Sequence, residues 1–234
     1  MTNDVATIDV VVRDGSTVCL RRTAESDVPA LQEFLESLSV DSRYHRFMGL
    51  PVLTESAVRS LAMSDGSRGT ALVVEARGRI VAFAGFYRDA QHRNRAEVAF
   101  VVSDALQGHG IGTRLLERLA AIAREHGIDT FDADVLGDNQ RMLDVFRESG
   151  FAMATRVEHG VYRVTLSLST TDAFADKAAA RSRAAATASM KAFFEPRTVA
   201  VIGANRERGK IGSEILHNLV TYGFTGTVVA VHPR

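Results

Sequence analysis

The sequence lacks several features that would point to a particular compartment or chemistry. It holds one cysteine, Cys19, in 234 residues, which excludes an intrachain disulfide and any metal site built from two cysteines. Its 28 basic and 28 acidic residues balance, so no overall field attracts nucleic acid or a membrane surface. No apolar signal segment follows the acidic start, and no apolar run is long enough to span a bilayer. We therefore expect a cytoplasmic protein without nucleic-acid or membrane partners, and the scattered histidines predict no metal site.

The chain divides into three zones by pattern. Strand-like and helix-like segments alternate over residues 17–169, which predicts an α/β (α+β) domain with a mixed sheet of about seven strands and helices on both faces. Residues 170–190 are rich in alanine and predict a semi-rigid, part-helical linker. Residues 191–234 predict a single Rossmann-like strand–helix–strand unit. Because one such unit cannot bury both faces of its strands, we expect an incomplete domain and therefore a fragment of a longer protein.

The most informative segment is the run Gln107-Gly108-His109-Gly110-Ile111-Gly112, between a predicted strand at 95–103 and a predicted helix at 111–126. The alternating glycines leave out side chains where a ligand would approach, and the helix start offers free N–H groups and a favourable dipole to a pyrophosphate. Thr113 adds a hydroxyl. No Lys-Ser/Thr pair follows the last glycine, which excludes a nucleoside-triphosphate loop. A plain strand-to-helix turn without a ligand is the alternative.

Gln-x-x-Gly-x-Gly after a strand resembles the acyl-CoA pyrophosphate motif of the GNAT superfamily of N-acetyltransferases. Asn139 and the Glu148–Phe151 turn extend the resemblance over residues 17–169. It implies the GNAT fold, with acetyl-CoA as cosubstrate in a V between two splayed strands, and the N–H of Val102 polarising the thioester carbonyl. For Asn139, capping its own helix is an equal alternative. The implied binding residues are Val101, Val102, Gln107, Gly108, His109, Gly110, Ile111, Gly112, Thr113 and Asn139.

Glu97, on the strand that enters this loop, is the candidate catalytic base. An amine acceptor such as lysine, with a pKa of roughly 10.4, must lose a proton before it attacks a thioester. A solvated glutamate on an edge strand is the alternative, and the resemblance favours the base. Phe146 stands where many relatives carry a tyrosine acid, so another group or water protonates the leaving thiolate, or it leaves unprotonated. Cys19 lies in an apolar strand and is interpreted as a small packing residue, which favours direct transfer.

Two further segments have two interpretations each. The basic connection Arg88–Arg95 either contacts an acidic acceptor or the adenosine 3′-phosphate, or it is simply solvated. In the segment Ser42–Phe47, interpreted as a loop, Tyr44 and Phe47 either line the acceptor site or only pack.

The segment Met190–Ala204 is similar to the start of the CoA-binding domain of NDP-forming acyl-CoA synthetases. The combination resembles the bacterial Pat-type protein lysine acetyltransferases. That resemblance implies acetyl transfer to a lysine ε-amine of a protein substrate, an AMP-forming acyl-CoA synthetase. Two alternatives stay open: acetylation of a small-molecule amine, and a non-catalytic acyl-CoA-sensing regulatory module.

Overall fold

The computed structural model describes residues 7–62, 69–204 and 209–232. The chain forms two compact units, Met1–Ala185 and Ala186–Arg234, and each is described by itself. Within the described ranges, none of the helices has the length and apolar character needed to cross a membrane.

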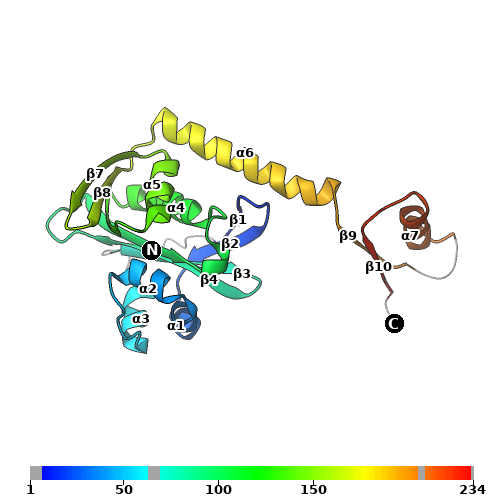
Figure 1. Cartoon of the computed structure of the whole chain (residues 1–234), viewed down its shortest axis with the longest axis horizontal. Helices are drawn as coiled ribbons and strands as arrows, with labels where there is room; N and C mark the ends of the chain where they lie inside the picture. Colours follow the sequence, from blue (N-terminus) through cyan, green and yellow to red (C-terminus); the bar gives the residue numbers. More distant parts are fainter. Residues whose placement is uncertain (1–6, 63–68, 205–208, 233–234) are drawn as a thin grey trace. The chain divides into compact units, whose positions relative to one another are not determined.

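The first unit is built on one mixed sheet of eight strands (Figure 1). The strand order is β1-β2-β3-β4-β5-β6-β8-β7, and every neighbouring pair is antiparallel except β5 and β6. The predicted mixed sheet is confirmed, and the strand beyond the expected number is β1, which precedes residue 17. The strands are β1 (Ile8–Val11), β2 (Thr17–Arg22), β3 (Gly69–Ala76), β4 (Arg79–Arg88), β5 (Arg95–Val102), β6 (Thr130–Leu136), β7 (Ala152–Glu158) and β8 (Val161–Ser167).

Helices cover both faces of this sheet, as predicted (Figure 1). One face carries α1 (Val28–Ser37), α2 (Val40–Phe47) and α3 (Glu55–Ala62), and the other carries α4 (Ile111–Glu125) and α5 (Gln140–Ser149). Each face of the sheet carries its own hydrophobic core, and alternate residues of β4 belong to one or the other. Phe83 packs with α1 and α3, whereas Ala82 and Ala84 pack with α4. This is the period-two alternation of a strand that is buried on both sides.

Helix α6 (Asp172–Phe194) is one continuous helix, which is more order than the part-helical linker that the composition predicted. Its first half packs on the first unit. Phe174 stacks on Phe151 with ring centroids 4.5 Å apart. The guanidinium of Arg181 donates hydrogen bonds to the carbonyl oxygens of Glu148 (2.6 Å) and Ser149 (3.1 Å). Those carbonyls end α5 and have no intrahelical donor, so Arg181 caps that helix from outside.

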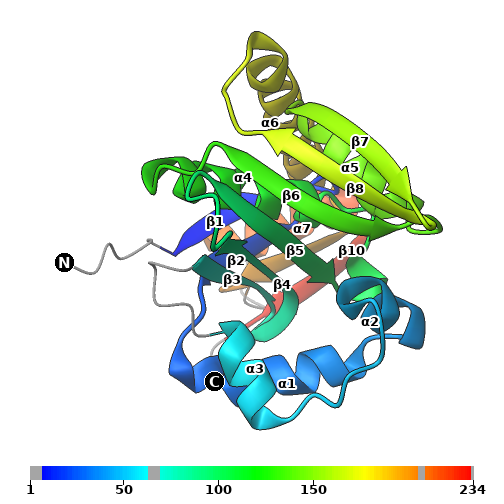
Figure 2. The same cartoon turned by 90° about the vertical axis from the view of Figure 1, so that its left-hand side faces the viewer.

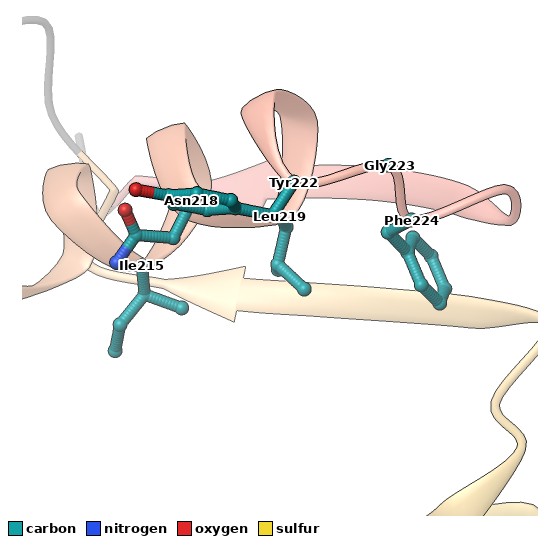
Figure 3. A pocket seen from close by; sticks show the side chains of 6 residues that line it. All are labelled: Ile215, Asn218, Leu219, Tyr222, Gly223 and Phe224. Carbon is teal, nitrogen blue, oxygen red and sulfur yellow. The ribbon is translucent and has the colours of Figure 1, made fainter.

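The second unit contains β9 (Thr198–Ile202), α7 (Ile211–Thr221) and β10 (Thr227–Val231), with β9 and β10 parallel. This is the strand–helix–strand unit that the sequence predicted. Ile202, Ile211 and Tyr222 are about four-fifths exposed. A hollow of about 510 Å³ lies beside α7, where Figure 3 shows Ile215, Leu219 and Phe224 projecting to the same side. Apolar surface of this extent is expected when one helix covers a two-stranded parallel sheet.

Candidate active site

Strands β5 and β6 pair over only three residues before they separate. The register joins Arg95 to Thr130, Ala96 to Phe131 and Glu97 to Asp132, and no further pair forms although both strands continue. Figure 2 shows the two strands running apart toward their C-terminal ends, with α2 beside the end of β5. The predicted V between these strands is therefore present, and Glu97 stands at the point where it opens.

The hydrogen bonds of β5 indicate which backbone groups face the V. Ser103 N–H donates to Val81 O of β4 at 2.8 Å. Because alternate residues of an antiparallel strand point to opposite neighbours, the backbone groups of Val102 and Phe100 face away from β4, toward the V. The carbonyl of Val102 accepts from the side chain of Gln107 at 3.2 Å, in agreement with this direction. The same alternation directs the backbone groups of Val101 to β4, and a contact between Val101 and pantetheine stays a prediction.

The glycine-rich loop presents backbone rather than side chains. Gly108 and Gly110 have φ values of 81° and 85°, which favour glycine because a Cβ would be strained there. Gly110 starts α4 without a side-chain cap, and the first turn contains no acidic residue. The N–H groups of Ile111, Gly112 and Thr113 therefore lack intrahelical acceptors at the positive end of the helix dipole. Ile111 and Thr113 are buried, so we interpret their contribution as backbone N–H groups.

Two predicted binding side chains are engaged within the protein. Gln107 donates to Ser42 Oγ at 3.1 Å and accepts from the Arg141 guanidinium. His109 Nδ1 lies 3.1 Å from the carbonyl oxygen of Gln107, and His109 Nε2 lies 3.7 Å from a carboxylate oxygen of Asp14. These contacts hold the loop in place, and binding of acetyl-CoA by these two side chains stays a prediction.

Asn139 caps its own helix. Its Oδ1 accepts from the N–H of Met142 at 3.2 Å, which confirms the capping alternative. A contact between Asn139 and pantetheine or phosphate stays a prediction.

Glu97 is exposed and lies in a hollow of about 240 Å³ at the foot of the V. Among the described residues its carboxylate has no hydrogen-bond or ion-pair partner. In contrast, the neighbouring Asp132 accepts from Arg95 Nε at 2.9 Å and from Thr165 Oγ1 at 2.9 Å. Four carboxylates line the hollow, so it favours a cationic acceptor. The lining residues are Tyr87, Arg88, Asp89, Glu97, Asp132, Ala133 and Asp134.

Among the residues that the structure describes, no general acid for the leaving thiolate is evident near the V. Phe146 is buried and packs edge-on against Phe100, with ring centroids 5.9 Å apart. Tyr87 is the phenol beside Glu97, but its hydroxyl donates to the carbonyl of Leu61 at 2.9 Å, and burial raises the pKa of Tyr87. A raised pKa makes a phenol a weaker acid, so a thiolate that leaves unprotonated or takes its proton from water agrees best with this geometry.

Cys19 lies on β2, separated from β5 by β3 and β4. Burial, and next the nearby charge of Glu75, raise the pKa of its thiol. This position favours direct transfer of the acetyl group over a route through a cysteine nucleophile.

Helix α2 was missed by the sequence interpretation, which treated Ser42–Phe47 as a loop. Ser39 caps it, with Oγ accepting from the Ser42 N–H at 3.2 Å. The signal was present in Ser39 with Asp41 in the first turn. Tyr44 is 46% exposed, whereas Phe47 is half-buried and packs against the core that Phe83 forms with α1 and α3.

Two contacts fix α2 beside the V. Ser42 Oγ donates to Asp104 Oδ1 at 2.6 Å, and His45 Nε2 lies 3.1 Å from Asp138 Oδ1. Burial raises the pKa of Asp104, but hydrogen bonds from Ser39 and Ser42 outweigh it, so the net pKa is below the ordinary carboxyl value.

The basic connection between β4 and β5 is bonded within the protein. Arg88 donates to the carbonyl oxygens of Arg93 and, at 2.8 Å, of His126, while Arg95 pairs with Asp132. These contacts favour a structural role for its two terminal arginines. Over the described part of the chain, no three His, Cys, Asp or Glu side chains are grouped as metal ligands.

Residues 32–151, just over half of the chain, match the acetyltransferase (GNAT) family. The chain belongs to this family, whose members use acetyl-CoA. It is 32% identical over 159 residues to acetyltransferase Pat of Mycolicibacterium smegmatis, covering 67% of this chain and 47% of that protein. The crystal structure of the GNAT domain of S. lividans PAT is similar with a TM-score of 0.65 and 36% identity, over 69% of this chain and 96% of that one.

A different relative is similar over a short stretch. The alpha subunit of an ADP-forming acetate–CoA ligase from Pyrococcus furiosus is 48% identical over 44 residues, 19% of this chain and 10% of that protein. The chain thus spans about half of the length of its Pat relative and a small part of the ligase subunit.

Proposed function

We propose that the protein transfers an acetyl group from acetyl-CoA to the ε-amine of a protein lysine. The observation that carries this proposal is the Glu97 carboxylate. It is exposed, has no hydrogen-bond partner among the described residues, and stands where β5 and β6 separate. A carboxylate at that place can accept a proton from an amine that approaches the V.

The donor side of the reaction rests on backbone groups. When bound, acetyl-CoA supplies an activated acyl group as a thioester. The free N–H groups at the start of α4 fit its pyrophosphate, and the N–H of Val102 faces the V, where it can donate to the thioester carbonyl oxygen. We propose that Gly108, Gly110, Ile111, Gly112 and Thr113 contribute through their backbone.

The chemical step uses Glu97 as general base. The lysine nitrogen loses a proton to the Glu97 carboxylate, directly or through one water, and forms a bond to the acetyl carbon. The carbon–sulfur bond then breaks and its electron pair leaves on the thiolate, while water takes the second proton that the nitrogen must lose to become a neutral amide. The thiol pKa of roughly 8.5 allows the thiolate to leave without a protein acid, and this agrees with the phenylalanine at position 146.

A protein acceptor is supported by apolar surface beside the V. Five large apolar side chains on α2 and the following segment are 41% to 82% exposed. Exposed apolar groups concentrated on one short segment are typical of a surface that binds another protein. They are Val40, Tyr44, Met48, Leu50 and Val52. Together with the similarity to Pat, this surface favours a protein substrate, and we propose an AMP-forming acyl-CoA synthetase.

We further propose a division of labour along the chain. Residues 17–169 form the transferase domain, residues 170–190 connect it to the next domain, and residues 191–234 begin a CoA-binding domain. The strand–helix–strand arrangement of β9, α7 and β10 supports the last assignment.

The test is incubation of the protein with isotope-labelled acetyl-CoA and a panel of purified acyl-CoA synthetases, followed by mass mapping of modified lysines. We expect one lysine of one synthetase class to be labelled. Labelling of free polyamines or amino acids alone would replace the protein acceptor by a small-molecule amine. Binding of acetyl-CoA without transfer to any amine would instead identify a sensing module.

A further inference from the structure

Arg46, near the end of α2, is half-buried and carries a positive charge that the sequence did not indicate. Its guanidinium carbon lies 4.9 Å from the ring centroid of Phe47 and 6.0 Å from that of Phe83. Its Nε and Nη2 atoms are inaccessible to solvent and have no hydrogen-bond partner among the described residues. The cation is therefore held against two aromatic rings, with two of its three nitrogens unsatisfied.

Such an arrangement is costly, because a buried charge without a bonded counter-ion loses its hydration with little in return. Burial lowers the pKa of Arg46, and the nearby groups of Tyr87 and Glu97 offset part of that effect. A guanidinium nevertheless stays protonated in proteins, so Arg46 is a permanent cation. A cost of this kind, at a candidate active site, indicates a function for the charge.

The charge of Arg46 lies over the same face of the sheet as Glu97. The register pairs Phe83 with Val101 and Tyr87 with Glu97, and side chains two and four positions apart on one strand share a face. Arg46 lies against Phe83 and interacts electrostatically with both Tyr87 and Glu97. An amine that reaches Glu97 therefore enters the field of this cation.

We propose that Arg46 activates the acceptor electrostatically: its fixed charge favours the neutral, nucleophilic form of the amine that approaches Glu97. The inference rests on the proposed function, since it concerns an amine acceptor at the same site. Arg46 acts through its positive charge as a positioning residue, and it neither donates nor accepts a proton in the reaction. A neighbouring cation is an established way to make an amine reactive near neutral pH.

Among the described residues, no acidic side chain forms an ion pair or a hydrogen bond with Arg46. On β4 and β5 the facing titratable groups are Tyr87 and Glu97, and the phenol of Tyr87 is neutral near pH 7 because burial raises its pKa. On α2 itself, Arg43 adds a second cation one turn earlier, and its Nε atom is also buried without a partner among the described residues. His45 on the same helix is directed to Asp138.

The experiment compares two acceptors in the full chain. One is the lysine peptide identified by mass mapping, and the other is the same peptide with the lysine replaced by its aminooxy analogue. The aminooxy nitrogen is unprotonated near neutral pH, so its reaction needs no help in losing a proton. The variants are Arg46→Met, Arg46→Lys and, as a matched control, Arg59→Met. Arg59 is an exposed arginine of α3 that pairs with Glu55 at 2.7 Å.

We expect Arg46→Met to lower kcat/KM for the lysine peptide about tenfold at pH 7, since a shift of one pKa unit corresponds to a factor of ten. The rising limb of its pH profile should move up by about one pH unit. The rate with the aminooxy peptide should change less than twofold, which also shows that the variant is folded. Arg46→Lys, which retains a cation, should lie closer to the wild type, and Arg59→Met should match it.

An equal loss with both acceptors would overturn the inference and leave Arg46 as a packing residue. So would a pH profile that does not move in Arg46→Met, or identical profiles for the Met and Lys variants. Failure of the proposed function has a different signature: the wild-type protein itself would transfer acetyl to neither peptide.

Discussion

The molecule contains two strand–glycine turn–helix segments that look alike in sequence and differ in their surroundings. In the first, β5 leads through Gly108 and Gly110 into α4, which buries nine of its 15 residues. In the second, β9 leads through Gly203 and Gly209 into α7, where only Ser213 is buried. The first turn belongs to an eight-stranded sheet, and the second to a two-stranded one.

The difference indicates that a glycine turn alone does not define the site that we propose. Beside the first turn, β5 parts from β6, and the Glu97 carboxylate has no partner among the described residues. Beside the second turn, β9 and β10 stay paired over all five residues of each strand. The transfer chemistry that we propose therefore depends on the gap between β5 and β6, and each prediction below tests one side of this comparison.

The largest effect should follow from Glu97→Gln, which keeps the shape of the side chain and removes the base. We expect kcat to fall about 10²- to 10⁴-fold, the usual contribution of general base catalysis, with acetyl-CoA affinity unchanged. Steady-state kinetics and calorimetric binding measure the two quantities. Glu36→Gln, an exposed glutamate of α1, is the control. Wild-type kcat in the Glu97 variant would assign the base to another group.

Arg181→Ala should weaken the first unit alone. It removes the hydrogen bonds to the last carbonyls of α5 and the ion pair with Glu117 on α4. We expect a loss of about 2–3 kcal/mol in the free energy of unfolding, as for hydrogen bonds to partly buried charged groups. Urea denaturation measures it, and Arg183→Ala, which is exposed on the same helix, serves as the control. Equal free energies of unfolding for the Arg181 and Arg183 variants would show that α6 does not stabilise α5.

Substitution of glycine by alanine should strain the backbone of both glycine turns to a similar extent. Gly110 and Gly203 have φ values of 85° and 81°, so alanine costs about 1–2 kcal/mol at either position. We expect Gly110→Ala to weaken acetyl-CoA binding about tenfold in the transferase assay, whereas Gly203→Ala leaves acetyl transfer at the wild-type rate. If Gly203→Ala lowered the transfer rate as much, the two turns would have to act together.

The smallest effect concerns acid stability. The Arg21 guanidinium, and then the Ala24 N–H, hold the pKa of Asp27 below its ordinary value against the opposing effect of burial. A lowered pKa means that this carboxylate stabilises the fold above the ordinary value of 3.8, and that the contribution fades as the pH falls through the folded-state pKa.

We therefore expect Asp27→Asn to cost about 1 kcal/mol at pH 7 and little near pH 2. Urea unfolding at both pH values checks this expectation. A pH-independent difference would mean that the ion pair is not its source.

Much of the transferase fold was predictable because local patterns and tertiary packing agree. Strand alternation and the apolar face of α4 are strong signals, and the glycine run at 107–112 together with Glu97 indicated the candidate site. Helix α2 has only eight residues and few apolar ones, so its periodicity was too weak to recognise. The directions in which the backbone groups of Val101 and Phe100 point depend on the hydrogen-bond pattern of β5, which the sequence does not encode locally.

The remaining differences come from contacts between distant residues. The alanine-rich segment showed helix propensity but not the stack of Phe174 on Phe151 that fixes its first half. Arg46 could be placed only after α2 was known to pack over β4. Both positions depend on tertiary neighbours that are far away in sequence.

The side chain of Gln107 has a kinetic consequence. It joins the glycine-rich loop to Ser42 on α2 and to Arg141 on α5, and it also donates a hydrogen bond to the carbonyl oxygen of Val102. The acetyl-CoA that we propose to bind this loop would therefore also stabilise the position of α2, the helix that carries Arg46. An enzyme built in this way should bind its substrates in a fixed order, with acetyl-CoA first, and the acceptor should dissociate more slowly from the complex than from the free protein.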